Sequence, residues 1–395
     1  MFHHLSALAY CLALLGCTTF GSPGAITPIS GTGTITSLPM PTQLSWFRSL
    51  RLEGLQTEHH SELGQPAYSP VQEAVWTGSS RGPLYRLSAH NGSVQWSKDV
   101  GGVRSPIAHY EGVLYLGADD GRLVAIDGAN GERLWSYKVK GIVTERPLIT
   151  KKSIYIVDGT NAVYSLNRQT GAWQWQYRRD SPRHFAAHGQ AAPTLSGTRL
   201  YQGFSDGYLV ALNATDGGLL WAKDLSAKNG SNPDVDASAI AVADSVYAAS
   251  LDGGLYCLDP SSGGVRWTLN LDGIIGLAKH EGDLLATLSN AKVVRIDTYK
   301  RRIRWETQMP RKRGNAYQAT LAGAKLIVGF DQGALYWLDL ATGQPLRRFD
   351  SGPGFSVPPT FAGGHVFAID NAAKLYSFRA HRQAPKTDRL PLGRR

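Results

Sequence analysis

LVAIDGANGERLW, residues 123–135, joins an alternating strand pattern to a tryptophan through a turn. Leu123, Ala125 and Asp127 alternate along this segment, which is typical of a strand with two different faces. An aspartate at the strand end can cap the turn through its side chain, and the glycine that follows accepts a positive φ. The second strand carries Trp135, whose large flat ring suits packing between neighbouring sheets. The segment therefore predicts two antiparallel strands joined by a tight turn.

The same pattern recurs along most of the chain, and successive copies end 38 to 46 residues apart. Two more strands precede each pair, as in SPIAHYEG followed by VLYLGADDG. Four antiparallel strands in a unit of this length are the signature of a propeller blade. The other copies are LYRLSAHNGSVQW ending at Trp96, VYSLNRQTGAWQW at Trp175, LVALNATDGGLLW at Trp221, LYCLDPSSGGVRW at Trp267, VVRIDTYKRRIRW at Trp305 and LYWLDLATGQPLRRF at Phe349.

The two ends of the repeat region indicate how the ring closes. The last unit, FSVPPTFAGGHVFAIDNAAKLYSFRA, supplies three strands and lacks its tryptophan strand, whereas the segment 44–50 around Trp46 resembles an orphan fourth strand. Pairing the two would remove exposed strand edges, which invite aggregation. We therefore predict an all-β propeller of eight blades over residues 43–380. Seven closed blades with a stray N-terminal strand are the alternative. The eight predicted blade anchors are Trp46, Trp96, Trp135, Trp175, Trp221, Trp267, Trp305 and Phe349.

Composition agrees with a large β domain. Of the 395 residues, 42% are hydrophobic and 18% charged, and the 44 glycines suit short strands with tight turns. The formal charge of +10 is spread along the chain, apart from one basic cluster at residues 300–304 and 311–313. That cluster is either a solvated turn with flanking strand ends or a patch for anionic lipid headgroups or an acidic partner. Aromatic residues interleaved as nucleic-acid binding requires are absent from it, so we expect no nucleic-acid partner.

The N-terminus predicts export. Residues 1–16 form an apolar run too short for a permanent membrane span. They end in Leu14-Leu15-Gly16-Cys17, which resembles the lipobox of bacterial lipoproteins and implies lipidation at Cys17. An ordinary secretory signal with a coincidental cysteine is the alternative. In that family Thr18, rather than an aspartate, implies sorting to the outer membrane, so we expect a lipid anchor at its periplasmic face.

The segments outside the propeller are short and polar. Residues 17–42 lack the apolar content to fold and are expected to form a flexible tether, while the basic tail 381–395 is expected to be disordered. After signal cleavage and lipidation Cys257 would remain alone, which we interpret as a small buried residue on a strand.

The repeat Tyr/Val-x-Leu-Asp-x-x-x-Gly-x-x-x-Trp resembles the PQQ-type propeller repeat over residues 43–380. Two families use this repeat: quinoprotein dehydrogenases and the BamB lipoproteins of the β-barrel assembly machinery. Local motifs favour the BamB family, because Asn232-Pro233-Asp234-Val235-Asp236-Ala237-Ser238 resembles its Asp-Val-Asp loop. The resemblance implies that Asp234 and Asp236 contribute to contacts with BamA, the barrel-inserting subunit.

A second loop carries the same resemblance. The segment from Phe185 to Thr194, FAAHGQAAPT, resembles a family loop in which two leucines and an arginine precede Gly-x-x-Ala-Pro-Thr. Phe185 keeps an apolar group, Ala187 is smaller than leucine, and His188 replaces the arginine with a side chain that is mostly neutral at pH 7. The resemblance implies partner contacts at these three positions. Ordinary solvated propeller turns are the alternative for both loops.

An enzyme is the other class of function to consider. A quinoprotein dehydrogenase needs a convergent site for its cofactor and calcium. The aspartates at 127, 259, 297 and 339 instead recur at one place in the repeat, as expected of turn residues. We therefore expect no catalytic residues, no metal site and no cofactor. The predicted function is a non-enzymatic scaffold that binds a BamA-type subunit and aids barrel insertion, with unfolded outer-membrane clients as further partners. A propeller that binds another periplasmic protein or an envelope glycan is the alternative.

Overall fold

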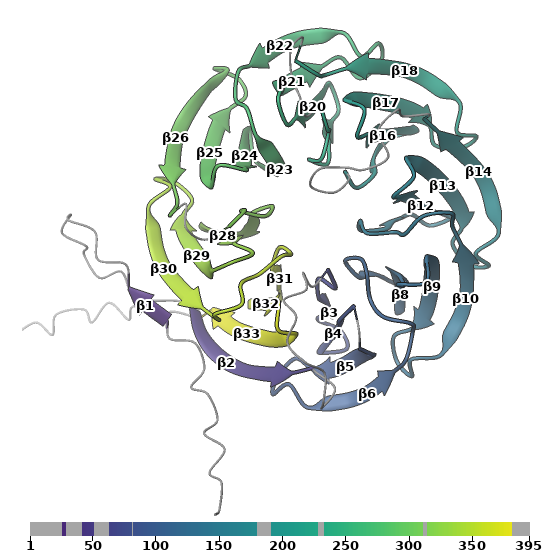
Figure 1. Cartoon of the computed structure of the whole chain (residues 1–395), viewed down its shortest axis with the longest axis vertical. Helices are drawn as coiled ribbons and strands as arrows, with labels where there is room; N and C mark the ends of the chain where they lie inside the picture. Colours follow the sequence, from purple (N-terminus) through teal and green to yellow (C-terminus); the bar gives the residue numbers. More distant parts are fainter. Residues whose placement is uncertain are drawn as a thin grey trace, which may run out of the picture.

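The protein is a ring of eight β-sheets (Figure 1). The computed structural model describes residues 26–28, 42–50, 63–80, 82–179, 191–227, 233–310 and 314–380, and all its regular elements are strands. Each sheet is a four-stranded antiparallel blade, and one blade carries a fifth strand. The predicted eight-bladed propeller is confirmed.

Blades 1 to 4 are continuous in sequence, and each runs from its innermost to its outermost strand. Their strands are β3 (Ala67–Ser69), β4 (Ala74–Gly78), β5 (Leu84–Ser88) and β6 (Val94–Lys98); β7 (Ala108–Tyr110), β8 (Val113–Gly117), β9 (Arg122–Asp127) and β10 (Arg133–Lys138); β11 (Leu148–Ile149), β12 (Ser153–Asp158), β13 (Ala162–Asn167) and β14 (Trp173–Arg178); and β15 (Thr194–Ser196), β16 (Arg199–Gly203), β17 (Tyr208–Asn213) and β18 (Leu219–Asp224).

Blades 5 to 8 repeat this order, with N-terminal strands added to the last two. Their strands are β19 (Ile240–Val242), β20 (Ser245–Ser250), β21 (Gly254–Leu258) and β22 (Val265–Leu269); β23 (Ile274–His280), β24 (Asp283–Leu288), β25 (Lys292–Asp297) and β26 (Arg302–Gln308); β27 (Thr320–Ala322), β28 (Lys325–Gly329), β29 (Ala334–Asp339) and β30 (Pro345–Asp350) with β1 (Ile26–Pro28); and β31 (Thr360–Ala362), β32 (His365–Ile369) and β33 (Lys374–Ala380) with β2 (Thr42–Ser49).

The ring closes between the two ends of the chain. Strand β2 pairs antiparallel with β33, with Leu44 opposite Phe378 and Trp46 opposite Ser377. The N-terminal strand therefore completes blade 8, and the alternative of seven blades with a stray strand is wrong. This pairing leaves blade 8 with the same four-stranded architecture as its neighbours.

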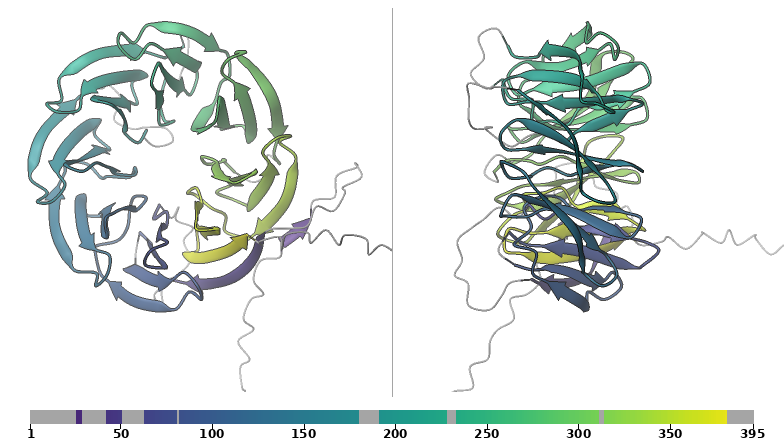
Figure 2. Two further views of the ribbon diagram at one scale, coloured as in Figure 1. Left: turned by 180° about the vertical axis from the view of Figure 1, so that it is seen from behind. Right: turned by 90° about the vertical axis from the view of Figure 1, so that its right-hand side faces the viewer.

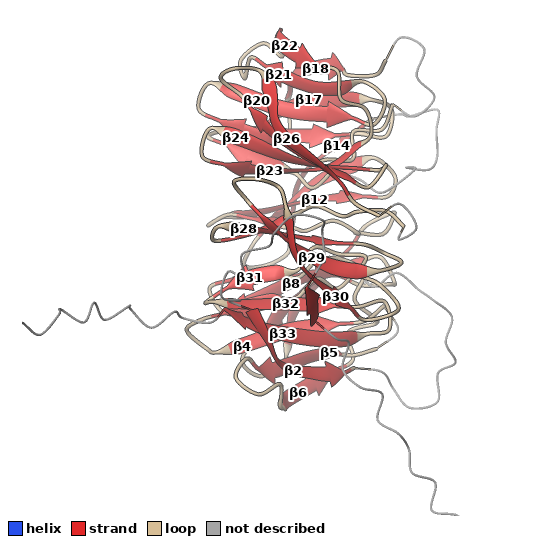
Figure 3. Cartoon of the chain, turned by 90° about the vertical axis from the view of Figure 1, so that its left-hand side faces the viewer, coloured by secondary structure: helices blue, strands red, loops and turns tan. Residues whose placement is uncertain are grey.

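The blades stand side by side around a disc with two distinct faces (Figures 2 and 3). In an antiparallel blade, the turns joining its first to second and third to fourth strands lie at one end, which we call the lower face. The turns joining the second to third strands lie at the other end, the upper face. The loops that lead from an outermost strand to the next innermost strand, such as residues 139–147, also lie on the upper face.

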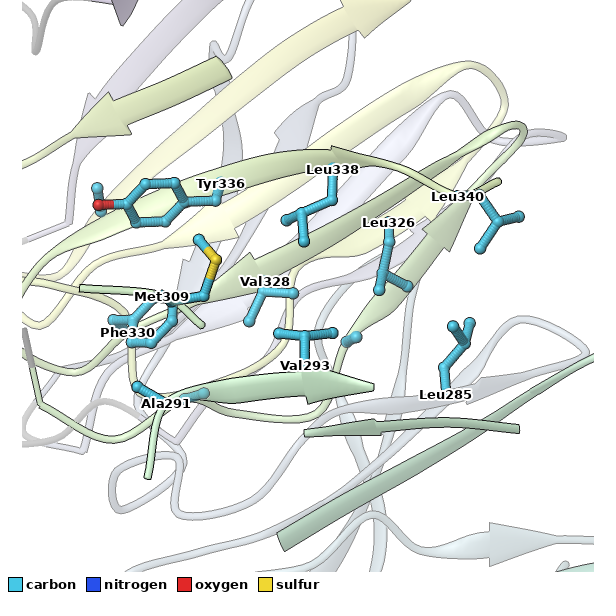
Figure 4. Close-up of a cluster of buried hydrophobic side chains, with 13 residues drawn as sticks. Leu285, Ala291, Val293, Met309, Leu326, Val328, Phe330, Tyr336, Leu338 and Leu340 are labelled. Atoms are coloured by element: carbon cyan, nitrogen blue, oxygen red, sulfur yellow. The ribbon is translucent and has the colours of Figure 1, made fainter. Parts of the chain in front are cut away.

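The hydrophobic core lies between adjacent blades. Each buried cluster draws residues from two neighbouring blades. Figure 4 shows the cluster between blades 6 and 7, where Leu285 and Val293 face Val328 and Leu338. Because every blade is covered on both sides, its two central strands are buried almost continuously rather than in alternation.

The repeated tryptophan of one blade packs against the repeated turn glycine of the next blade. All eight predicted anchors lie on the fourth strand of their blades, counted outwards from the centre of the ring. The indole N–H of Trp175 donates to the Ala214 carbonyl of the next blade at 3.1 Å, and Gly217 of that blade lies on the indole face. A Cβ at Gly217 would be 2.6 Å from the ring, and its φ is +76°. The repeat therefore requires glycine both for the turn and for the approach of the neighbouring tryptophan.

The expected tether departs from the prediction in one place. Ile26–Pro28 pairs antiparallel with β30 on the outer edge of blade 7. The pairing uses main-chain groups of an open strand edge, so it does not require the apolar content on which the prediction rested. Cys17, the signal segment 1–16 and the tail 381–395 lie outside the described residues. Cys257 is buried on β21, in agreement with its interpretation as a small core residue.

Candidate protein-binding site on the upper face

The predicted Asp-Val-Asp motif forms a loop held between blades 4 and 5. Its main chain is fixed on both sides, because Val235 N–H donates to the Phe204 carbonyl at 3.2 Å and Leu251 N–H donates to the Asp234 carbonyl at 2.9 Å. The Val235 side chain is buried against Gly203, where a Cβ would collide with it. The loop is therefore a fixed part of the upper face.

The two aspartates of this loop lie in different environments. Asp234 is only 3% exposed, so its side chain shapes the loop from within rather than forming an open surface group. Asp236 is partly exposed, and its buried Oδ2 has no hydrogen-bond partner among the described residues. Burial, together with the negative charges of Asp234 and Glu145, raises the pKa of Asp236 to about 8. The protein thus keeps an incompletely paired carboxyl group at this position.

Glu145 brings a third carboxyl group from blade 3, and we call Glu145, Asp234 and Asp236 the acidic cluster. Glu145 lies three residues before the innermost strand β11, and Asp236 lies four residues before β19. The adjacent Arg146 is directed to other partners: it donates to the Ile107 carbonyl at 2.8 Å and to Gln65 Oε1 at 2.7 Å. Its guanidinium therefore ties blade 3 to blades 1 and 2.

The second predicted motif, residues 185–194, is described from residue 191 onwards, and this part contacts the loop that carries the first motif. The N–H of Ala192 donates to Ser238 Oγ at 2.9 Å, and Thr194 Oγ1 donates to the Ala239 carbonyl at 2.8 Å. The two sequence motifs are therefore neighbours in space. The predicted contact residues Phe185, Ala187 and His188 lie outside the described residues.

We expect Asp236→Asn to stabilise the fold in a pH-dependent way. A carboxyl group whose folded-state pKa is above its unfolded value of 3.8 costs no stability below about pH 4, and the cost grows as pH rises towards about 8. The neutral amide removes this cost, so the free energy of unfolding should rise by about 1–3 kcal/mol at pH 8 and be unchanged at pH 4. Urea unfolding at both pH values measures the difference. The control is Asp272→Asn, an exposed acid on the same face, and an equal gain there would contradict the assignment.

Other kinds of site have no counterpart in the part of the chain that is described. No group of three or more His, Cys, Asp or Glu side chains in that part, the acidic cluster included, is placed so that it could hold a metal ion. Nor do those residues include a helix long and apolar enough to cross a membrane.

The comparison with protein families decides the assignment. Residues 80–307, more than half of the chain, match the family model described as "Outer membrane protein assembly factor BamB". This chain belongs to the BamB family.

Curated BamB proteins resemble the chain over almost its whole length. The protein from Yersinia pestis is 22% identical and that from Escherichia coli 25%, each over 92% of this chain and 95% of the relative. The protein from Burkholderia pseudomallei is 25% identical over 86% of this chain and 91% of its own. All three carry the name "Outer membrane protein assembly factor BamB".

Solved structures agree on the fold. The crystal structure of BamB from Moraxella catarrhalis has a TM-score of 0.72 at 19% identity and covers 90% of this chain and 100% of its own. A europium-containing methanol dehydrogenase has a TM-score of 0.69 at 13% identity, covering 86% and 93%. The propeller is thus shared by BamB proteins and by enzymes, and function has to be argued from the loops.

Two residues of this BamB-family site were missed in the sequence. Glu145 and Arg146 precede Pro147 at the repeat position where blade 4 has Ala191 and Ala192 before its proline. Two adjacent charges in place of small residues, at the start of an innermost strand, were the signal that could have identified them. The ring brings Glu145 close to Asp236, although the two are far apart in sequence.

Proposed function

We propose that this BamB-family chain is a non-enzymatic scaffold lipoprotein of the outer-membrane β-barrel assembly machinery. Its partner in this proposal is the BamA-type subunit, bound on the upper face around the loop 233–239. Membership of the family supports the assembly role, and the meeting of the two sequence motifs at one site supports the location.

The observation that carries the location is the state of Asp236. A buried carboxyl oxygen without a hydrogen-bond partner costs stability, and nearby like charges add to that cost. Such a group is expected where a binding partner supplies the missing interaction. The chemistry that completes it is a basic side chain, which would lower the pKa of Asp236 and pair with its ionised form. Asp234 acts in this proposal through the shape of the loop.

The mechanism is positioning. Loops fixed on a rigid ring can orient a flexible partner without forming or breaking covalent bonds. The loops around Phe185, Ala187 and His188 would widen the contact, and open outer strand edges would be available to unfolded client chains.

The repeated aspartates support the absence of catalysis. Asp127 Oδ1 accepts the N–H groups of Ala129 and Asn130 at 2.7 and 3.2 Å. Asp339 caps its own turn through Thr342 in the same way. Each of these carboxylates accepts main-chain hydrogen bonds within its own turn on the lower face. A cofactor site would instead require several such carboxylates to point towards one common centre.

The membrane attachment proposed is a lipid on Cys17 at the periplasmic face of the outer membrane. The family name supports a place in the cell envelope, and the lipobox-like Leu14-Leu15-Gly16-Cys17 supports the anchor. One lipid anchor with a short tether would keep the ring near the barrel-inserting subunit.

The test is a detergent-solubilised pull-down of the tagged full chain. Wild type is expected to recover the BamA-type subunit, and Asp236→Asn to recover about tenfold less, because a charge-assisted interface contact is lost. Asp272→Asn, on the same face, should behave as wild type. The Asp236→Asn protein is expected to be at least as stable as wild type, so lower recovery cannot be attributed to unfolding.

Each outcome of the pull-down has a distinct meaning. Recovery by Asp236→Asn equal to wild type would exclude Asp236 as a contact. Recovery of some other envelope protein by wild type, without the barrel subunit, would contradict the assembly role and leave the propeller unaffected.

A further inference from the structure

One turn of the lower face departs from the repeat. The structure describes six other turns that join the third strand of a blade to its tryptophan or phenylalanine strand. In each of them a glycine with positive φ lies four residues after the residue that caps the turn. These glycines are Gly92, Gly131, Gly171, Gly217, Gly263 and Gly343. In blade 6 that position is Arg301, with a φ of +55°. We call residues 298–302, Thr-Tyr-Lys-Arg-Arg, the blade 6 turn.

The departure has a structural cost. An arginine in the left-handed region is strained relative to glycine. The anchor tryptophan of the neighbouring blade 5, Trp267, also lacks a contact. Among the described residues it is the one anchor tryptophan whose indole N–H forms no hydrogen bond to the next blade. The equivalent Trp221 donates to the Pro260 carbonyl at 3.0 Å. A left-handed φ at a residue other than glycine also occurs at Glu111 and Glu281 on the same face, so what sets the blade 6 turn apart is the cation that replaces the repeat glycine.

The blade 6 turn presents three exposed cations, and only Lys300 lies near enough to an acid, Asp297, to lower the pKa of that acid. Lys300, Arg301 and Arg302 are exposed and form no ion pair within the described part of the chain. The nearby acids are already used: Arg304 pairs with both Asp283 and Asp297 at 2.9 Å. The exposed Glu281 on the adjoining turn lies 4.0 Å from His280 Nε2 and forms no ion pair with the blade 6 turn among the described residues.

Apolar groups accompany these cations. Tyr299 is 91% exposed at the tip of the turn, and Ile303 is exposed at the start of β26. A tyrosine that projects among lysine and arginine side chains suits the boundary between water and lipid, where its ring sits at headgroup level. The residues of the basic cluster seen in the sequence therefore differ in role. Arg304 is held in ion pairs with Asp283 and Asp297, whereas the cations of the blade 6 turn are exposed to solvent. Residues 311–313 lie outside the described residues.

The geometry points to the blade 6 turn as a contact site for the surface of a membrane that contains anionic phospholipid. Lys300, Arg301 and Arg302 would lie on the phosphate groups, and Tyr299 would enter the interface. This contact is independent of the partner site, which lies on the opposite face of the disc.

The charge of the turn and its exposed tyrosine argue for a membrane surface as the occupant, and the N-terminal strand places the rim of the disc within reach of one. Strand β1 lies on the outer edge of β30 in blade 7, the neighbour of blade 6 (Figure 1). Only residues 18–25 separate Ile26 from Cys17. A chain of that length spans at most about 30 Å. Ile26 pairs with Phe349, near the end of β30 that meets the upper face, so a lipid on Cys17 would hold the rim of blade 7 within reach of a bilayer without itself setting which face of the disc meets it.

The test measures sedimentation of the full chain with vesicles, using Cys17→Ala so that no acyl chain is attached. The vesicles are phosphatidylcholine with or without phosphatidylglycerol. Lys300→Thr with Arg301→Gly copies Thr342 and Gly343 of blade 7. This variant should bind phosphatidylglycerol vesicles roughly tenfold to thirtyfold more weakly at low salt, because each cation near an anionic surface contributes a factor of about five. Its melting temperature should be unchanged or higher, since the strained arginine is removed.

Two controls separate this site from the general positive charge. Lys151→Thr with Lys152→Thr removes two exposed cations from another lower-face turn and should leave binding within about twofold of wild type. Tyr299→Ser should weaken the binding that persists at about 1 M salt, where charge interactions are screened. Three results would overturn the proposal. The first is that the Lys151/Lys152 variant loses as much vesicle binding as the Lys300/Arg301 variant. The others are that wild type binds vesicles equally well without phosphatidylglycerol, or that it binds no vesicles.

Discussion

Trp175→Ala is expected to lower the free energy of unfolding by about 3–5 kcal/mol, as for other large buried aromatic residues. Trp175 is only 5% exposed in the cluster between blades 3 and 4, and its ring lies against Gly217 of the next blade. The substitution would leave a cavity at a blade interface that the chain cannot close without moving a whole sheet. Urea unfolding measures this loss, and an unchanged m-value would show that the substitution lowers the stability without changing the surface exposed on unfolding.

Trp173 provides the matched control on the same strand. It is 56% exposed on the outer side of β14, so Trp173→Ala should change stability by no more than about 0.5–1 kcal/mol. Trp175→Phe should fall between the two, because the Ala214 carbonyl still accepts a hydrogen bond from the Tyr155 hydroxyl at 2.9 Å. Equal losses for Trp173→Ala and Trp175→Ala would contradict the role given to the repeat tryptophan.

The blades could be predicted because each repeat encodes its own contacts. The turn aspartate, the turn glycine and the tryptophan act within one blade or between adjacent blades, so their spacing carries the information. Closure by the strand around Trp46 could also be predicted, since three strands at one end and one at the other are complementary.

Other features depend on the three-dimensional ring. Glu145 joins Asp236 only after closure brings blade 3 near blade 5, and no local pattern reports that distance. The burial of Asp234 follows from the main-chain bonds of its loop to Phe204 and Leu251. Arg301 stood out in the sequence as part of a charge cluster, but its strain becomes visible only from its φ. The pairing of Ile26–Pro28 with β30 involves main-chain atoms, which side-chain patterns do not describe.

The second large effect concerns which face of the disc meets the partner. A photo-reactive residue placed at Lys140 or Asp272, both exposed on the upper face, should cross-link to the BamA-type subunit in cells. The same residue at Glu132 or Thr170, exposed in lower-face turns, should give no such product. None of these four side chains belongs to the acidic cluster, so the substitutions leave the proposed contact intact.

Site-specific cross-linking is therefore the most direct test of the proposed partner face. The proposal predicts cross-links to the barrel subunit from Lys140 and Asp272, and their reduction when Asp236→Asn is added. Cross-links from Glu132 and Thr170, with none from the upper-face positions, would contradict it.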